Sequence, residues 1–352
     1  MRIGILTSGG DCAGLNAVMR GFVKAITAVD PKVEIYGIKD GYGGLISREY
    51  RVIEPGEFAD ILKLGGTILG TSRQPYKKLI FTERDKVEQM KENYRKMGLD
   101  VLVVLGGQGT HKTAAFLSGE GLNVIGLPKT IDNDIWGTDF TFGFHSAVSV
   151  ATECIDRVQT TAESHGRVMI VEVMGNKAGW LTLYAGIASG ADVILIPEIP
   201  YSIDKVVKAV ERAEERKGFC IIAVAEGAMD ESEAPLTKKE RFQKRAEQGE
   251  TTASNRIAKA IAERLGVETR VVVPGHIQRG GGPVPYDRVL CTQMGAYAAR
   301  LAAEGRFGVT VALVGGGITC NSLADIAGKT KFVPPRHELI RAAKDIGVSF
   351  GE

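Results

Sequence analysis

A short polar loop at residues 128–134 carries the side chains best suited to chemistry in this chain, and it directly follows an apolar run. The loop holds Lys129, Thr130, Asp132 and Asp134. In an open α/β sheet, ligands bind outside the carboxyl ends of the strands, where this loop would lie. A carboxylate there can take a proton from an alcohol, and a lysine can hold a phosphate. The loop therefore suggests transfer of a phosphoryl group to a hydroxyl.

The two carboxylates of this loop would have different tasks. Asp132 is the candidate general base that deprotonates a sugar hydroxyl. Asp134 could orient the same hydroxyl or a metal-bound water. The alternative is an Asx-type turn in which both aspartates cap backbone groups. Lys129 stands beside them without being needed for such a turn, and this favours the catalytic interpretation.

Glycine is abundant, with 44 residues, and it concentrates where strands or turns end, at residues 8–10, 41–44, 106–109 and 280–282. One such segment could be plain turn chemistry, but four together suggest that the backbone approaches ligands closely. The segment 8–16 opens a helix, whose N-terminal amide groups can bind an anion. The segment 106–110 repeats this arrangement. It is neither a Walker A loop nor a full GxGxxG, so the usual P-loop and dinucleotide fingerprints are absent.

Cationic side chains gather in a second region of the sequence. Arg270, His276 and Arg279 lie within ten residues of one another. This set suits a phosphate monoester, because an arginine can hold a phosphate bidentately. Arg73 lies in an expected exposed turn and could reach a transferring phosphate. Taken alone, His276 would more often be a structural residue, and Arg73 a surface charge.

The elements that must position these residues follow an alternating pattern. Strands are expected at residues 3–6, 33–38, 101–105, 123–127, 168–173, 193–196, 220–225, 270–273 and 309–314. These runs are rich in Val and Ile and mostly do not alternate, as in strands buried on both faces of a parallel sheet. Helical spacing recurs at residues 146–161, 206–217 and 255–265. The alternation predicts an α/β fold with parallel sheets.

Composition sets the broad class. The chain has 352 residues, 44% apolar and 24% charged, as in a globular protein of two ordinary domains. A net charge of +2 gives no case for nucleic-acid binding, and no apolar run approaches the ~20 residues of a membrane span. Five scattered cysteines and no signal-peptide pattern predict a reduced, cytoplasmic setting. The polar stretch 230–252 is interpreted as a solvated insertion or exposed helix, not a site.

Seven motifs together resemble those of the phosphofructokinase family. In chain order they are TSGGD, GGTILGTSR, GGQGT, PKTIDND, RVMIVEVMG, AVAEG and ETRVVVPGHIQRGG. They span residues 3 to about 295. TIDND and HIQRGG are quite specific to the family, whereas GGxGT is shared with lipid and NAD kinases. The resemblance implies two Rossmann-like, doubly wound domains with mostly parallel sheets, and an enzyme that phosphorylates the 1-hydroxyl of fructose 6-phosphate.

The resemblance also assigns roles to individual residues. Asp132 would be the general base, with Lys129, Thr130 and Arg73 as further catalytic groups. The phosphoryl donor would be bound by Gly10, Arg73, Gly107, Gln108, Gly109 and Thr110. The sugar phosphate would be bound by Thr130, Asp132, Arg167, Met174, Gly175, Asn176, Glu226, Arg270, His276 and Arg279. Arg167 and Arg270 stand where the family reaches across a subunit interface, so a homodimer or homotetramer is expected.

Three positions depart from the family pattern. Gln108 stands where the family usually has an acidic residue near Mg²⁺. An amide oxygen can ligate Mg²⁺ but brings no charge. The resemblance implies Mg²⁺ as the cofactor, with Gln108 and Asp134 as the two candidate ligands. Asn176 stands where the family usually has Arg, which removes a cation near the acceptor. Ala13 replaces a usual Pro, a matter of backbone stiffness.

The donor is either ATP or pyrophosphate. In this family, Gly at position 109 leaves room for a nucleotide α-phosphate, whereas Lys at position 129 is typical of pyrophosphate users. We expect ATP, because access at Gly109 is a precondition for a nucleotide and Lys129 excludes none. Thr113 could crowd an adenosine and argues the other way. A non-catalytic sugar-phosphate sensor is the alternative of another class, motivated by Gln108 and Asn176.

The resemblance further implies how the chain is divided. Residues 1–143 with about 278–330 would form the larger, donor-binding domain. Residues 144–277 with about 331–352 would form the smaller, sugar-phosphate domain.

Overall fold

The computed structural model describes residues 1–247, 249 and 252–352, and the chain divides into two compact units. Unit 1 comprises Met1–Ser146 and Arg279–Lys331, and unit 2 comprises Ala147–Gln278 and Phe332–Glu352. The first division falls inside a long helix, α6 (Phe144–His165). Both units are α/β with mostly parallel sheets, which confirms the predicted fold class.

Unit 1 is built around a seven-stranded sheet in the order β11-β10-β5-β4-β1-β2-β3, counted over the described residues. Its five central strands are parallel, and the two edge strands run antiparallel to their neighbours. The strands are β1 (Arg2–Ser8), β2 (Glu34–Ile38), β3 (Tyr50–Ile53), β4 (Val101–Gly106), β5 (Val124–Pro128), β10 (Val309–Val314) and β11 (Gly317–Ser322). The edge strands β3 and β11 were not predicted, because their side chains are mostly exposed or half-buried and form no apolar run.

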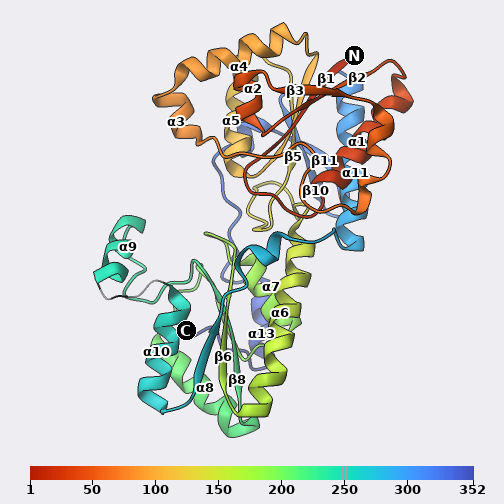
Figure 1. Ribbon diagram of the computed structural model, residues 1–352. Coiled ribbons are helices and arrows are strands. Elements are labelled where there is room, and N and C mark those ends of the chain that lie inside the picture. The colour runs from red at the N-terminus through yellow and green to blue at the C-terminus, as the bar shows by residue number, and fades with distance from the viewer. Residues whose placement is uncertain (248, 250–251) are drawn as a thin grey trace. The chain divides into compact units, whose positions relative to one another are not determined.

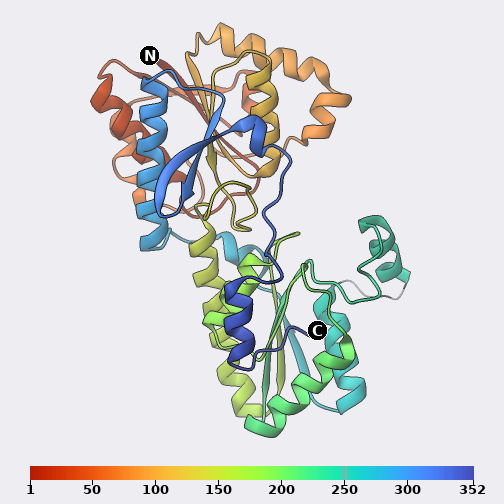
Figure 2. The same cartoon turned by 180° about the vertical axis from the view of Figure 1, so that it is seen from behind.

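Helices cover both faces of this sheet (Figures 1 and 2). One face carries α1 (Leu15–Val29) packed against α11 (Pro285–Ala303). The other carries α2 (Tyr42–Ser47), α3 (Tyr76–Phe81), α4 (Arg84–Lys96), α5 (Gln108–Gly119) and α12 (Leu323–Ile326). Two 3₁₀ turns, Pro55–Phe58 and Ile61–Lys63, lie beside α1.

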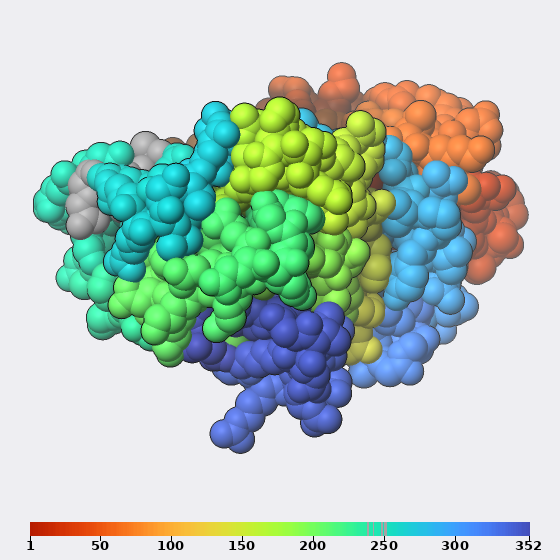
Figure 3. All heavy atoms as spheres, turned by 90° about the horizontal axis from the view of Figure 1, so that it is seen from below, coloured from red at the N-terminus to blue at the C-terminus, as the bar shows by residue number. Residues whose placement is uncertain are grey.

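Unit 2 contains a fully parallel sheet in the order β7-β8-β6-β9 among its described residues. The strands are β6 (Val168–Val173), β7 (Val193–Leu195), β8 (Cys220–Ala225) and β9 (Thr269–Val272). One face carries α8 (Ile203–Lys217) and α10 (Ala253–Leu265), and the other carries α7 (Trp180–Ala188) and α13 (Glu338–Asp345), with α6 alongside. Figure 3 shows α13 and its C-terminal neighbours on the surface of this unit. The remaining elements are α9 (Lys238–Glu247) and the 3₁₀ turn Gly275–Arg279.

The nine predicted strands are all present, and most of them are largely buried, with β9 half-buried as the exception. Every residue of β4, β6 and β8 is buried, as expected for central strands covered on both faces. In unit 1, β4 lies between β1 and β5, so the loops after these three strands meet at one edge of the sheet. In unit 2, the loops after β6 and β8 meet in the same way. The described residues include no helix long and apolar enough to cross a membrane.

Candidate active site

Lys129 links two of the loops at the carboxyl edge of unit 1. It follows β5, and its side chain is only 4% exposed. The ammonium group donates a hydrogen bond to the carbonyl oxygen of Gly10 in the loop after β1. Burial lowers the pKa of Lys129, and the nearby Arg279 acts in the same direction. The Gly10 carbonyl therefore stabilises the ammonium of Lys129, which is shielded from water.

The turn after Lys129 is held by side chains other than the candidate base. Thr130 Oγ1 accepts a hydrogen bond of 3.0 Å from the backbone amide of Asp132. Asn133 has a φ of +50°, a conformation that Asn tolerates, and its Oδ1 accepts from the amide of Thr141 at 3.1 Å. These contacts fix the backbone beside Asp132, whose side chain is half-buried. The arrangement suits a positioned carboxylate.

Asp134 follows in the same loop and is also half-buried. Burial raises the pKa of its carboxyl above the usual value, against weaker opposing effects that include the charges of Lys129 and Lys331. Its backbone oxygen accepts hydrogen bonds from the amide of Lys331 at 2.9 Å and from Gln108 Nε2 at 3.1 Å. The main chain of Asp134 thus ties the loop after β5 to α5.

Gly10 in the loop after β1 lies against the side chain of Arg279. A Cβ atom there would overlap the guanidinium of Arg279, whose Nη1 donates a 3.0 Å hydrogen bond to the carbonyl of Asp11. Arg279 therefore lies in unit 1 against this loop. The next loop contributes Thr110, whose hydroxyl donates to the carbonyl of Ser8 at 3.3 Å. The predicted donor loops thus lie side by side.

Gln108 and Gly109 begin α5 after β4. The Gln108 amide nitrogen donates hydrogen bonds to the Asp134 carbonyl and, at 2.8 Å, to Thr330 Oγ1. Its amide oxygen is the atom that could ligate a cation. A Cβ atom on Gly109 would meet nothing within 4 Å in the part of the chain that the structure describes. Thr113 is buried, and its hydroxyl bonds to the Gly109 carbonyl at 3.3 Å. The space in front of Gly109 is therefore open, and Thr113 does not crowd it.

Arg73 is exposed and stands next to the loop after β1. The neighbouring Ser72 forms a bridge with Ser8 and accepts a 3.0 Å hydrogen bond from the amide of Gly9. These backbone contacts bring Arg73 to the same edge of the sheet as Gly10. Within the described residues no group of three or more His, Cys, Asp or Glu side chains could hold a metal ion.

Unit 2 brings four of the predicted acceptor residues together. Glu226, directly after β8, accepts hydrogen bonds from the amides of Gly175 at 3.3 Å and Asn176 at 2.7 Å. Met174 starts this loop after β6. Asn176 has a φ of +52°, a left-handed conformation that Asn tolerates better than Arg. The backbone therefore favours Asn at this position. Through its two hydrogen bonds, the Oε1 atom of Glu226 shapes this loop.

Gln278 is a positioning residue that sequence reasoning missed. It is 2% exposed, and its Oε1 accepts a 3.2 Å hydrogen bond from the amide of Met174, while Nε2 donates to the Gly275 carbonyl. It thereby joins the turn that carries His276, which is exposed, to the end of β6. Its place inside the HIQRGG motif was the available signal.

Arg167 and Arg270 lie at the opposite end of β6. Arg167 precedes the strand, and Arg270 pairs in register with Met169. Both guanidinium groups bind the carboxylate of Glu268, Arg167 at 2.8 Å. At 3.3 Å per residue along β6, Arg270 lies roughly 20 Å and Arg167 roughly 26 Å from Gly175. Within one chain these arginines do not join the loop around Glu226.

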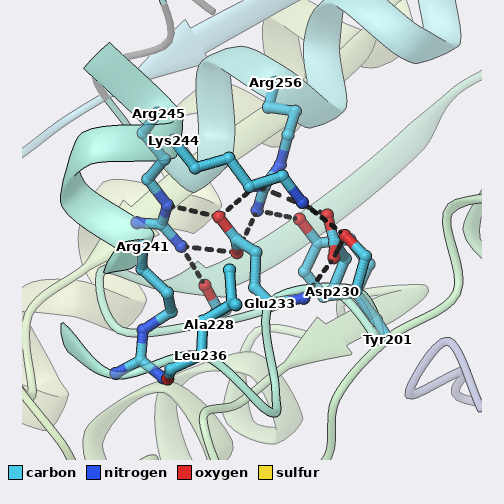
Figure 4. Close-up of polar contacts among 10 residues, drawn as sticks. Tyr201, Ala228, Asp230, Glu233, Leu236, Arg241, Lys244, Arg245 and Arg256 are labelled. Atoms are coloured by element: carbon cyan, nitrogen blue, oxygen red, sulfur yellow. Dashed lines mark hydrogen bonds and ion pairs between the residues drawn. The ribbon is translucent and has the colours of Figure 1, made fainter. Parts of the chain in front are cut away.

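A cavity of about 1070 Å³ lies in unit 2 at the carboxyl ends of β6, β7 and β8, and its wall includes Glu172, Asn176, Lys177, Glu226, Arg241 and Phe332. Arg241 belongs to α9, which agrees with the exposed helix expected within residues 230–252, of which 248, 250 and 251 lie outside the described residues. The contact of this segment with a cavity was not predicted. The physical reason is an ionic network that sequence patterns do not reveal (Figure 4). At its centre Glu233 is fully buried, 2.7 Å from Arg245 and 2.6 Å from Arg256.

Comparisons with known proteins point to one family. A family model described as Phosphofructokinase matches residues 2–302. The chain is 53% identical to an ATP-dependent 6-phosphofructokinase of Spirochaeta thermophila, over 99% of this chain and 97% of that one. It is 47% identical to a pyrophosphate–fructose 6-phosphate 1-phosphotransferase of Amycolatopsis methanolica, over 95% and 97%.

Solved structures agree in fold. A phosphofructokinase from Saccharomyces cerevisiae superposes with a TM-score of 0.79 at 32% identity, covering 93% of this chain and 45% of that one. A pyrophosphate-dependent phosphofructokinase from Nitrosospira multiformis gives a TM-score of 0.83 at 22% identity, covering 99% and 92%. The second likeness concerns the fold alone.

Proposed function

This chain belongs to the phosphofructokinase family, and on that premise we propose that it is a 6-phosphofructokinase of glycolysis. It would transfer the terminal phosphoryl group of ATP to the 1-hydroxyl of fructose 6-phosphate, giving fructose 1,6-bisphosphate. The observation that carries the proposal is the loop after β5, in which Thr130 orients the backbone of Asp132 beside the buried ammonium of Lys129. We expect this reaction in the cytoplasm, where the five free cysteines would stay reduced.

Asp132 acts as the general base in this proposal. Its carboxylate takes the proton of the 1-hydroxyl as that oxygen bonds to the terminal phosphorus and the bond to the leaving phosphate breaks. The transition state is loose and its charge lies on phosphate oxygens. Positioning of the reactants and nearby positive charge therefore supply most of the catalysis. Lys129 and Arg73 supply that charge at the edge of unit 1, and the glycines of both donor loops let the phosphates approach the backbone.

ATP is supported as the donor by the space at Gly109. A residue in the first turn of a helix is more stable as Ala than as Gly, yet nothing in the described chain would obstruct a Cβ there. The absence of a side chain is therefore better explained by a ligand than by packing. The buried position of Thr113 removes the one crowding argument against adenosine.

Pyrophosphate is the second candidate donor because of Lys129. Its buried ammonium lies at the junction of the loops after β1 and β5, where it could neutralise a small, highly charged donor as well as ATP. The Amycolatopsis methanolica relative carries a name with this donor. The 53% identical relative carries an ATP-dependent name, so ATP remains the first candidate and the donor assay tests the choice.

The residues of the donor loops could bind Mg²⁺ through only one or two protein oxygens. Mg²⁺ keeps several waters and is bound through one or two protein oxygens plus substrate phosphates. Gln108 Oε1 and the Asp134 carboxylate are the proposed ligands, and the raised pKa of Asp134 weakens it as a direct ligand. When bound with the donor, the ion would offset phosphate charge.

The acceptor is proposed to bind through unit 2 and a second subunit. Met174, Gly175, Asn176 and Glu226 would contact the sugar, with His276 on the turn that Gln278 ties to them. Arg167 and Arg270 lie at the far end of β6, which supports their acting in the site of a neighbouring copy in a homodimer or homotetramer.

The experiment that tests the proposal is a donor-by-acceptor activity matrix with the purified full chain, with and without Mg²⁺. ATP and pyrophosphate are each paired with fructose 6-phosphate and with other hexose phosphates. Formation of fructose 1,6-bisphosphate from ATP, dependent on Mg²⁺, is the expected result. Turnover with pyrophosphate alone would select the second donor. Saturable fructose 6-phosphate binding without turnover from either donor would support the sensor instead.

A further inference from the structure

One buried side chain in the first turn of α5 has no role in the proposed mechanism. His111 is 1% exposed, and each of its ring nitrogens lies within hydrogen-bond distance of another group. Nδ1 lies 3.0 Å from the carbonyl oxygen of Gly107, and Nε2 lies 2.9 Å from Thr310 Oγ1 on β10. Because a carbonyl oxygen can only accept, Nδ1 carries the ring proton and donates the hydrogen bond to Gly107.

The second ring nitrogen of His111 is a hydrogen-bond acceptor. Burial lowers the pKa of His111 to about 4, although the hydrogen bond with Gly107 opposes this effect, so the ring is neutral at neutral pH. In a neutral ring with Nδ1 protonated, Nε2 has a lone pair and accepts from the Thr310 hydroxyl. Two hydrogen bonds therefore run in one direction, from Thr310 through His111 to Gly107.

The neighbouring strand leaves room for this chain of hydrogen bonds. Gly126 of β5 pairs in register with Thr310 of β10. A Cβ atom on Gly126 would lie 2.8 Å from Thr310 Oγ1 and 3.1 Å from His111 Nε2. A glycine inside a strand weakens it and often marks a close approach of another group. Here the glycine allows the histidine and the threonine to meet above β5.

The Gly107 carbonyl at the end of this chain belongs to the proposed donor loop. It also accepts a 3.0 Å hydrogen bond from the backbone amide of His111, so its direction is fixed twice. Across a trans peptide the next N–H points the opposite way, and this fixes the amide of Gln108. The amides of Gln108, Gly109 and Thr110 have no acceptor among the residues that the structure describes, as is usual where a helix begins.

We propose that His111 is a positioning residue for the phosphoryl donor: supported by Thr310, it holds the Gly107 carbonyl so that the first amides of α5 face the donor phosphates. The inference rests on the proposed function for the identity of the ligand. His111 touches no reacting atom, so its effect should appear in the use of the donor and not in the use of fructose 6-phosphate.

Steady-state kinetics of the full chain test this role, with whichever of ATP and pyrophosphate the wild type uses. His111→Phe keeps an aromatic ring and removes both nitrogens, so the KM for the donor should rise about tenfold while the KM for fructose 6-phosphate stays unchanged. His111→Asn places an amide nitrogen near the position of Nδ1. It should bring the donor KM back to within about threefold of wild type.

Thr310→Val is a milder second variant, because it keeps the side-chain shape and removes only the hydroxyl. Alone it should raise the donor KM about threefold. Added to His111→Phe it should change nothing further, since the chain is already broken. Additive effects of the two substitutions would overturn the proposed chain.

Tyr201→Phe is the matched control for a structural role. Tyr201 is also 1% exposed, and its hydroxyl accepts a 2.8 Å hydrogen bond from Arg256 in unit 2. This control should lower the melting temperature and leave the donor KM unchanged. If His111→Phe behaves in the same way, or raises both KM values equally, the positioning role is overturned.

The same variants separate this inference from the proposed function. Wild-type turnover together with an unchanged donor KM in His111→Phe would overturn the inference and leave the function standing. A wild type without turnover from either donor would contradict the function, and calorimetry with pyrophosphate then tests the inference. Binding that weakens in His111→Phe and recovers in His111→Asn supports it, whereas equal binding by all three proteins, or none by wild type, overturns it.

Discussion

The ammonium of Lys129 donates its hydrogen bond to the carbonyl oxygen of Gly10, across the end of the intervening strand β4. This contact joins the loop that carries Asp132 to the loop that would receive the donor phosphates. An ammonium has three donors, so two remain for phosphate oxygens. Burial lowers the pKa of Lys129, and a bound phosphate would favour the charged form again.

Replacing Lys129 by Met should affect the two donors unequally. The variant keeps the side-chain volume but removes the charge, so turnover with pyrophosphate should fall by about a hundredfold or more and turnover with ATP by less. Leaving the Gly10 carbonyl without its partner should lower the free energy of unfolding by about 1–3 kcal/mol. Steady-state kinetics with each donor and urea unfolding measure both effects. Equal losses with both donors would refute a donor-selective role.

Replacing Gly109 by Ala should separate stability from donor binding. Because a Cβ there meets nothing in the described chain, the variant should be as stable as wild type or more stable by up to about 1 kcal/mol. The methyl group would occupy the space proposed for ATP and raise the KM for ATP about tenfold, as mild overpacking does. Thermal melting and ATP titration provide the two measurements. A stable variant with unchanged KM for ATP would remove the argument from Gly109.

The ion pairs of Glu233 with Arg245 and Arg256 should make the free energy of unfolding depend on pH between about 4.5 and 2. Burial alone would raise the pKa of Glu233, but hydrogen bonds from Arg245 and Arg256 outweigh it and lower the pKa from 4.5 to about 2. The unfolded chain therefore takes up this proton first, and the stabilisation is present above pH 4.5 and lost as the pH falls towards 2.

Glu233→Gln tests this dependence. At pH 7 the variant should be less stable than wild type by about 3 kcal/mol, and the difference should shrink as the pH falls below 4.5. Denaturant unfolding of both proteins at several pH values gives the difference directly. Glu215→Gln, at an exposed position of α8, serves as the control. A difference that stays constant down to acidic pH would show that the charge of Glu233 is not the source of the stability.

The parts of the fold that could be predicted from sequence are those whose burial leaves a recognisable apolar pattern. Strands such as β4 and β8, covered on both faces, appear as apolar runs, and the polar loops that follow them were located correctly. The edge strands β3 and β11 have a mixed pattern and were missed. Their pairing depends on a neighbour rather than on their own residues.

The candidate site was predictable in its loops but not in its tertiary contacts. The loop at residues 128–134 follows from a strand end, and the resemblance named Glu226, but its hydrogen bonds to the loop after β6 were not predicted. The burial of Glu233 depends on two arginines 12 and 23 positions away, and no local pattern distinguishes it from a surface glutamate. Gln278 likewise acts through Met174, 104 positions earlier.

The measurement that tests the central claim most directly is the turnover of Asp132→Asn with fructose 6-phosphate and whichever donor the wild type uses. Removing a general base while keeping the shape should lower kcat by about 10²–10⁴-fold and leave the dissociation constant for fructose 6-phosphate nearly unchanged. Asp139→Asn is the control, because that nearby carboxylate accepts a hydrogen bond from the Gly315 amide instead. Full turnover in Asp132→Asn would contradict the account.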